Sequence, residues 1–598
     1  MDGAILPRPY PAEKLDMHHR QIRLVTLLPG RYIDVISCGL STVSLDDLPD
    51  YNALSYAWGD RTDLHDILLN GVAFKVTRNL EAALRRLRHP VNHLLLWIDM
   101  LCIDQGSVEE KTHQVNLMHL IYSRAVEVFL WLGDYVETTL QKTSIPSQPN
   151  QSQEDISQHE AVLALTGLQH LSADHHFDAF ALGTGPRLNK AQVDAVGKLV
   201  ELSWWHRIWT VQEVILPSKV TVVVGWLQFD WTTLAAAAHG FFRHQSLRCC
   251  TMYAQTSTLH IFYERVDEIE RCRADYHRGG RLNLLSLLNE FRSRSSTDPR
   301  DKIFGLLGVV KKDPQYHGMQ ADYSLSVELA YRQVFLHLFR ESKTMNSLVR
   351  PSETGRTLDL PTWMPDWTAT VEESTKDIEY DLRNTLHLYN ACLSTRMDVR
   401  WPGTAKTLVV KGLLFDRVAA IPGRLPNEDL SSENHLCDHV KTLHDDMEIS
   451  NPSYVGGGSL AHAFWRLTSL DKVFVMSDDF VRGVARRTTV QDHKNYPDVF
   501  RLFADGAPST CSLPAFQFFI SAMGYIGLGP KSMRVGDTVH VFLGGSVPFV
   551  LRQIVEQTNS SASETRYEFV GNCFVQGIMD GEALHGVDLH TLGWFNLV

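Results

Sequence analysis

Short apolar runs that stop at turn residues are typical of the first part of the chain. One run occupies residues 22–27, and a second, 51–58, ends at a Gly-Asp pair. Asn70-Gly71 separates two further runs, and this dipeptide is the strongest short signal for a β-hairpin. The pattern therefore predicts β-strands over these segments and a tight hairpin at residues 70–71.

A β-α-β pattern spans residues 94–133. The apolar run 94–98 ends in Asp99, an amphipathic helical pattern follows, and a second apolar run covers 126–132. A helical crossover of this kind joins parallel strands. In open α/β sheets, ligands bind where strand carboxyl ends and helix amino termini meet. We therefore expect any chemistry of this part of the chain near Asp99.

Several polar residues stand where helices are predicted to begin. Asn79 precedes a stripe of three leucines, so it is a candidate helix cap. Ser107 and Glu110 have the spacing of a capping box. Capping is also the structural alternative for Asp99 and Asp104, since aspartate strongly favours such positions.

Composition and hydrophobic pattern change along the 598 residues, a length that predicts several domains. Residues 139–158 are polar and indicate a flexible loop or an insertion. Stripes of leucine and aromatic residues predict helices over 232–345, and short strands with glycine turns follow after residue 400. The predicted parts are a strand-rich lead-in (1–45), an α/β domain (46–230) with an insertion (139–190), a mainly helical region (231–400) and a β-rich barrel or sandwich (401–598).

Charge and composition exclude several classes of protein. The net charge is −12 and the isoelectric point is about 6.1, which argues against a nucleic-acid binder. No window holds the eighteen or more apolar residues that a membrane segment needs, and no secretory signal is visible. The nine cysteines form no Cys-x-x-Cys pair, so we expect no metal site and a reducing compartment. These features favour a cytoplasmic protein.

Three carboxylates are the candidate chemistry of this chain. Phosphate-loop, His-Glu-x-x-His and Gly-x-Ser-x-Gly signatures are absent. Asp60 and Asp99 each end a predicted strand, and Glu213 ends the aromatic-rich segment 204–213. Since the carboxyl ends of parallel strands meet at one edge, we expect these three side chains to share a rim.

Glu213 has an aromatic neighbour at helical spacing. Trp209 lies four residues earlier, so in a helix the two side chains share a face. An aromatic wall desolvates a carboxylate and raises its pKa, which suits an acid, a base or a polar stabilising group. The alternative is structural: the aromatic residues pack on the sheet, and Glu213 pairs with Arg207 or Lys219. The sequence leaves both readings open.

Three segments, in order, resemble the motifs of the fungal heterokaryon-incompatibility (HET) domain: 51–59, 96–105 and 205–213. Within them, Asp104 stands where the family more often has Asn, and Ala57 where Val is common. Further stretches are similar to segments that usually follow this domain, namely 297–308, 322–324, 360–367, 524–530 and 577–582.

The resemblance implies a role in non-self recognition between fused fungal cells, ending in growth arrest or programmed cell death. The HET domain would act through a protein partner or by self-association, without chemistry of its own. The family is also considered a distant relative of the TIR domain, which implies a flavodoxin-like open parallel sheet for residues 46–230.

The TIR relation also implies an enzymatic alternative. In TIR domains that split NAD, the catalytic glutamate lies in a Trp-x-x-x-Glu motif, and Glu213 matches that position. NAD would then be a substrate and not a bound cofactor, and the protein would be an NAD glycohydrolase. The residues expected to line the ligand site are Trp58, Gly59, Asp60, Asp99, Arg207 and Trp209. A shared fold does not carry an activity with it, so catalysis stays an alternative to signalling.

Overall fold

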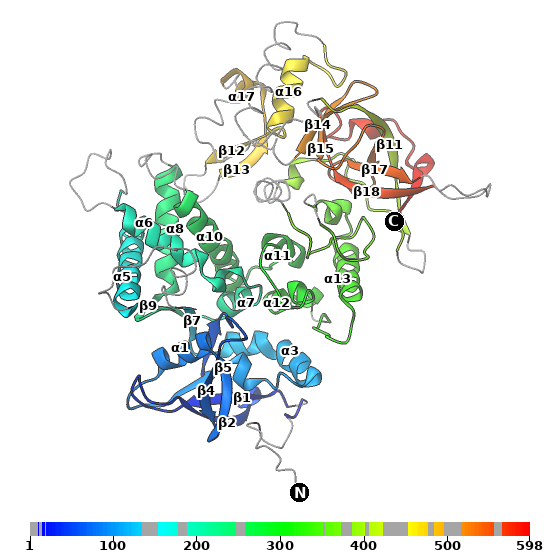
Figure 1. Cartoon of the computed structure of the whole chain (residues 1–598). Coiled ribbons are helices and arrows are strands. Elements are labelled where there is room, and N and C mark those ends of the chain that lie inside the picture. The colour runs from blue at the N-terminus through cyan, green and yellow to red at the C-terminus, as the bar shows by residue number, and fades with distance from the viewer. Residues whose placement is uncertain are drawn as a thin grey trace. The chain divides into compact units, whose positions relative to one another are not determined.

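The computed structural model divides the chain into two compact units, residues 1–326 and 327–598 (Figure 1). The described residues are 10, 15–17, 19–133, 153–176, 188–246, 257–311, 313–316, 318–350, 353, 355–371, 385–400, 406–422, 453–476, 483–495, 516–554 and 565–598.

The first unit contains a nine-stranded sheet with β3 (Asn52–Tyr56) in its centre. β3 is parallel to β6 (Leu94–Trp97) on one side and to β7 (Val128–Gly133) on the other, and β7 is parallel to β8 (Val220–Val224). The sheet order is β5-β4-β2-β1-β6-β3-β7-β8-β9. The other strands are β1 (Gln21–Leu27), β2 (Ser37–Ser44), β4 (Leu64–Leu69), β5 (Val72–Thr77) and β9 (Leu227–Asp230).

The predicted α/β class is confirmed, with a sheet that is parallel in its middle and mixed toward its edges. β1 pairs antiparallel with both β2 and β6, and β9 pairs antiparallel with β8. The predicted hairpin joins β4 and β5, and its turn residues Asn70 and Gly71 have φ angles of 52° and 76°. Positive φ at both positions is what a two-residue type I′ turn requires.

Asn79 is not the helix cap that the sequence predicts. Helix α1 (Arg78–Leu87) begins one residue earlier, with Thr77 at the N-cap position. The Asn79 amide instead donates to the Ala57 carbonyl oxygen at 2.6 Å and accepts from Trp131 Nε1 at 2.7 Å. Asn79 thus ties the chain after β3 to the neighbouring strand β7.

Helix α3 (Val108–Arg124) is held to strand β1 by a buried ion pair. Ser107 caps the helix as predicted, since its hydroxyl accepts from the Glu110 backbone N–H at 3.2 Å. The Glu110 carboxylate does not complete the capping box. It receives both terminal guanidinium nitrogens of Arg23, at 2.5 and 3.0 Å, and the Asp104 backbone N–H at 2.7 Å. Arg23 also donates to the Cys102 carbonyl oxygen at 3.0 Å.

Helices cover the sheet and continue the first unit. α7 (Thr210–Ile215) is buried along its whole length. Gly305 and Gly308 of α12 (Asp301–Val310) let α12 lie close to α7 and the residue segment just before it. A Cβ atom at Gly308 would collide with the Gln212 side chain of α7. The other helices are α2 (Asp99–Cys102), α5 (Gln153–Ser172), α6 (Lys190–Glu201), α8 (Trp231–Ser246), α10 (Ser257–His277) and α11 (Leu284–Glu290). The predicted insertion 139–190 contains α5, and part of the insertion lies outside the described residues.

The second unit contains the predicted β-rich region, which follows residue 400. Its strand pairings run β16-β17-β18-β20-β11 and return from β11 to β16, which closes a five-stranded barrel. β11 is long enough to pair with β14 as well. β14 in turn pairs with β15, and β15 pairs with β19. The barrel strands are β11 (Leu408–Ala420), β16 (Thr538–Phe542), β17 (Phe549–Ile554), β18 (Arg566–Asn572) and β20 (Gly593–Leu597).

The remaining elements of the second unit are shorter strands and peripheral helices. The strands are β10 (Val399–Arg400), β12 (Lys472–Met476), β13 (Gly483–Arg487), β14 (Phe516–Ser521), β15 (Ile526–Pro530) and β19 (Phe574–Val575). The helices are α13 (Val327–Ser342), α16 (Leu460–Thr468) and α17 (Val490–Asn495). Across the described residues of both units, no helix combines the length and apolar character needed to cross a membrane.

The buried ion pair gives the first prediction. Glu110→Ala leaves the Arg23 charge buried without its partner, and such losses cost about 3–5 kcal/mol of unfolding free energy. The double variant Arg23→Met, Glu110→Leu removes both charges and fills the space, so it should lose much less. Urea unfolding of the full chain measures both. Equal losses in the single and double variants would contradict a penalty that comes from the unpaired charge.

Candidate functional site

A cluster of buried polar side chains, here called the polar cluster, lies at the carboxyl ends of β3 and β6. Ser55 lies near the end of β3, and Asp99 lies two residues after the end of β6, at the start of α2. Glu213 reaches the same place from α7. Because β3 and β6 are parallel neighbours, their carboxyl ends lie side by side.

Glu213 is buried in this cluster, with 5% of its surface exposed. Its Oε2 accepts a hydrogen bond from the Ser55 hydroxyl at 2.6 Å, and Ser55 Oγ in turn accepts from Trp204 Nε1 at 2.8 Å. Burial raises the pKa of the Glu213 carboxyl to about 8, although the Arg207 charge and the Ser55 hydrogen bond act in the opposite direction. Glu213 is therefore neutral in much of the folded protein near pH 7.

Asp99 is the second carboxylate of the cluster. It accepts a hydrogen bond from Trp58 Nε1 at 2.6 Å and from the Met100 backbone N–H at 2.7 Å. Burial raises its pKa, and the Arg207 charge followed by these hydrogen bonds opposes that rise. The Met100 contact lies in the first turn of α2, so Asp99 has a local structural role as well as a place in the cluster.

Arg207 supplies positive charge to both carboxylates. Its guanidinium donates to the Tyr56 carbonyl oxygen at 3.1 Å and lies 5.9 Å from the centre of the Trp58 ring. Its charge opposes the rise in the pKa of Asp99 and of Glu213 that burial causes. In the part of the chain that the structure describes, neither carboxylate forms a direct ion pair with Arg207, and Lys219 pairs instead with Glu127 at 3.2 Å.

Three other residues of the predicted site have different surroundings. Asp60 is exposed, and its carboxylate accepts from the Thr62 backbone N–H and hydroxyl at 2.8 and 2.7 Å, which lowers its pKa. Gly59 forms the turn before it, with φ of 74°. Trp209 is half-buried and lies close enough to the buried Asp301 of α12 to act against the rise in the pKa of that carboxyl. The structure thus brings together two of the three carboxylates, and a ligand-binding role for these residues stays a prediction.

Ser55, Tyr56 and Trp204 belong to the cluster but were not among the predicted site residues. Ser55 is fully buried and Tyr56 is 3% exposed. The only sequence signal for Ser55 was a hydroxyl residue inside an apolar strand, where a buried polar group needs a partner. Trp204, and not Trp209, is the aromatic residue that contacts the Glu213 hydrogen-bond chain.

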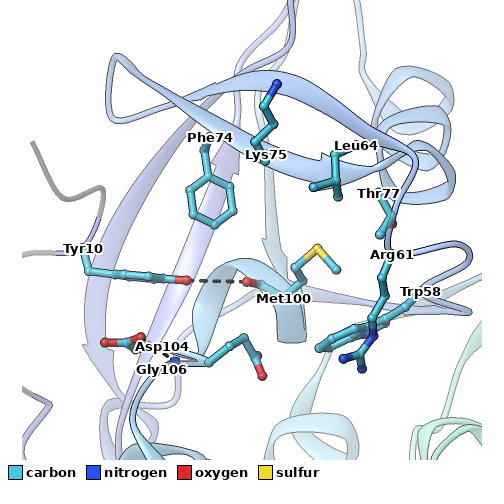
Figure 2. Close-up of a pocket in the computed structure, with 11 residues that line it drawn as sticks. Tyr10, Trp58, Arg61, Leu64, Phe74, Lys75, Thr77, Met100, Asp104 and Gly106 are labelled. Carbon is cyan, nitrogen blue, oxygen red and sulfur yellow. Dashed lines mark hydrogen bonds between the residues drawn. The ribbon is translucent and has the colours of Figure 1, made fainter. Parts of the chain in front are cut away.

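A surface cavity of about 380 Å³, here called the Trp58 cavity, opens beside the cluster (Figure 2). Trp58 connects the two, because its ring lines the cavity and its Nε1 donates to Asp99. Glu213 and Arg207 are not among the lining residues, which are Tyr10, Trp58, Arg61, Leu64, Phe74, Lys75, Thr77, Met100, Asp104, Gln105 and Gly106. No group of three or more His, Cys, Asp and Glu side chains within the described ranges is placed to hold a metal ion.

Two segments of the chain match the models of known protein families. Residues 51–213 match the family described as "Heterokaryon incompatibility protein (HET)", and residues 512–588 match the "Het-6 beta-barrel domain". The first match begins just before β3 and ends at Glu213, so it contains the polar cluster. No solved structure matches.

A curated relative is similar over nearly the whole chain. The protein "Heterokaryon incompatibility protein 6, OR allele" of Neurospora crassa is 24% identical over 677 aligned positions, which cover 94% of each chain. The similarity therefore extends over both units.

The raised pKa of Glu213 gives the second prediction. Between pH 4.5 and about 8 the folded chain binds a proton at Glu213 that the unfolded chain has released, so this group makes the unfolding free energy fall as the pH rises. Glu213→Gln removes that dependence and can keep the hydrogen bond to Ser55. Relative to the wild type, the variant should gain stability from pH 5 to pH 8, by about 1 kcal/mol or more.

Urea unfolding of both proteins at several pH values tests this, with the exposed Glu109→Gln as the matched control. The difference between Glu109→Gln and the wild type should not change in the same way. A Glu213→Gln difference that stays constant over this pH range would contradict a buried, neutral Glu213.

Proposed function

We propose that this HET-domain protein acts in non-self recognition between fused fungal cells and that its HET domain triggers growth arrest or programmed cell death. The domain would do so by meeting a protein partner or a second copy of itself. The proposal locates the chain in the cytoplasm, where the contents of fused cells mix.

The observation that carries this proposal is the match of residues 51–213 to the HET family, combined with similarity to an incompatibility protein over 94% of both chains. Heterokaryon incompatibility is the function that both descriptions name. The second unit contains a closed barrel. Residues 512–588 of this unit match the "Het-6 beta-barrel domain", whose name also refers to heterokaryon incompatibility proteins.

The geometry of the polar cluster supports signalling better than catalysis. A catalytic Glu213 would have to touch a substrate, yet the residue is only 5% exposed, its carboxylate accepts from Ser55, and it does not line the Trp58 cavity. As a buried, hydrogen-bonded group it instead fixes α7 against the end of β3. In this proposal the cluster keeps the domain in the shape that a partner recognises.

The third prediction concerns cell death. Inducible expression of the full chain in a filamentous fungus, in the genetic background that provokes incompatibility, should kill hyphal compartments, scored with a vital dye. Glu213→Gln keeps the Ser55 contact and the neutral charge state, so killing should persist within about twofold. The exposed Glu109→Gln is the control for the effect of an amide substitution.

Cellular NAD measured in the same cultures separates signalling from NAD cleavage. In the signalling proposal, Glu213→Gln and wild type kill alike, and NAD does not fall before the cells die. If wild-type expression depletes NAD first, and Glu213→Gln abolishes both the depletion and the killing, the glycohydrolase alternative is correct and the signalling proposal is wrong.

A further inference from the structure

The Trp58 cavity has the position of a ligand site. It lies beside the carboxyl ends of β3 and β6, which supply Trp58 and Met100 through the segments that follow them. The β4–β5 hairpin closes its other side with Phe74, Lys75 and Thr77 (Figure 2). Crevices at this edge of open α/β sheets are where ligands bind, and about 380 Å³ falls within the range of small-molecule sites.

The walls of the cavity are aromatic and apolar. Phe74 and Tyr10 lie edge to face, with ring centres 6.4 Å apart, and Trp58 forms another wall. Tyr10 is fixed in place because its hydroxyl donates to the Ile103 carbonyl oxygen at 3.2 Å. Leu64 and Met100 lie between these rings. Such walls favour a flat aromatic ring, which can stack against side chains of this kind.

Positive charge lies at the mouth of the cavity. The Arg61 guanidinium is exposed, lies 4.7 Å from the centre of the Trp58 ring and has no carboxylate partner among the described residues. Lys75 pairs with Asp66 at 2.8 Å, but both side chains are more than half exposed, so the pair is weak and the lysine can turn to another anion. An anionic group on the ligand would be attracted to this end.

A buried hydroxyl supplies an independent indication of a ligand. Thr77 lines the cavity and is 2% exposed, yet its Oγ1 has no hydrogen-bond partner. Leaving a buried polar group without a partner costs about 1–3 kcal/mol, and native structures rarely do so without a reason. On another side of the cavity, Asp104 and Gln105 offer acceptors for an N–H donor.

We propose that the Trp58 cavity binds a mononucleotide, with the base packed against the aromatic and apolar lining and the phosphate at Arg61. The base donates from its exocyclic amine toward Asp104 or Gln105, and a ribose hydroxyl or ring atom satisfies Thr77. Binding involves no bond cleavage and is independent of the role in incompatibility. Because Trp58 donates to Asp99, an occupied cavity would also be linked to the buried cluster.

The fourth prediction tests this with three ligands titrated into the full chain by calorimetry: AMP, adenosine for the base alone and ribose 5-phosphate for the anion alone. AMP should bind most tightly. Arg61→Gln should weaken AMP at least tenfold and leave adenosine almost unchanged, because only AMP carries the charge that Arg61 meets. Thr77→Val, which keeps the side-chain shape, should weaken both AMP and adenosine severalfold.

The matched control is Arg78→Gln, which removes an exposed arginine at the start of α1 that does not line the cavity. It should bind AMP as the wild type does. Circular dichroism and thermal midpoints establish that each variant is folded. Three results would overturn the proposal: no binding of AMP or adenosine at millimolar concentration, equal affinity of AMP and ribose 5-phosphate, or an equal loss of AMP affinity in Arg78→Gln and Arg61→Gln.

Discussion

The hydrogen bond between Ser55 and Glu213 is the contact on which the carboxyl edge of the first sheet depends. A carboxylate brought into an apolar interior is costly unless it is neutralised and hydrogen-bonded. Here burial keeps Glu213 protonated and neutral through most of the range near pH 7, the Ser55 hydroxyl hydrogen-bonds to it, and Trp204 completes the chain of donors. The result is a short chain of hydrogen bonds between β3 and α7 that fixes the position of the helix.

The position of α7 in turn links the family motif to residues outside it. Trp209, at the N-cap of this helix, lies near Asp301 and acts on the pKa of its carboxyl, while Gly308 allows α12 to lie close against Gln212. The segment that carries Asp301 and Gly308 thus belongs physically to the same unit as the cluster. The first unit is therefore larger than the 51–213 match alone.

Sequence reasoning identified the elements of the fold more completely than the site. Apolar runs and turn residues were sufficient for the central strands and the hairpin at Asn70, because these signals are local. The role of Asn79 was not predictable, since its partners Ala57 and Trp131 are brought near only by the pairing of β3 with β7. The same holds for the Trp58 cavity, whose walls join Tyr10, Phe74 and Met100 from distant segments.

The close packing of α12 on α7 also determines where this chain can be divided. A recombinant fragment that stops soon after β9, which ends at Asp230, would contain the whole 51–213 match but lack α12. Ile208, which faces Gly305, and the part of α7 around Gln212, which faces Gly308, would then meet water, and newly exposed apolar surface promotes aggregation. Soluble expression of the isolated module would require an endpoint beyond Val310, near the boundary of the first unit at Ser326.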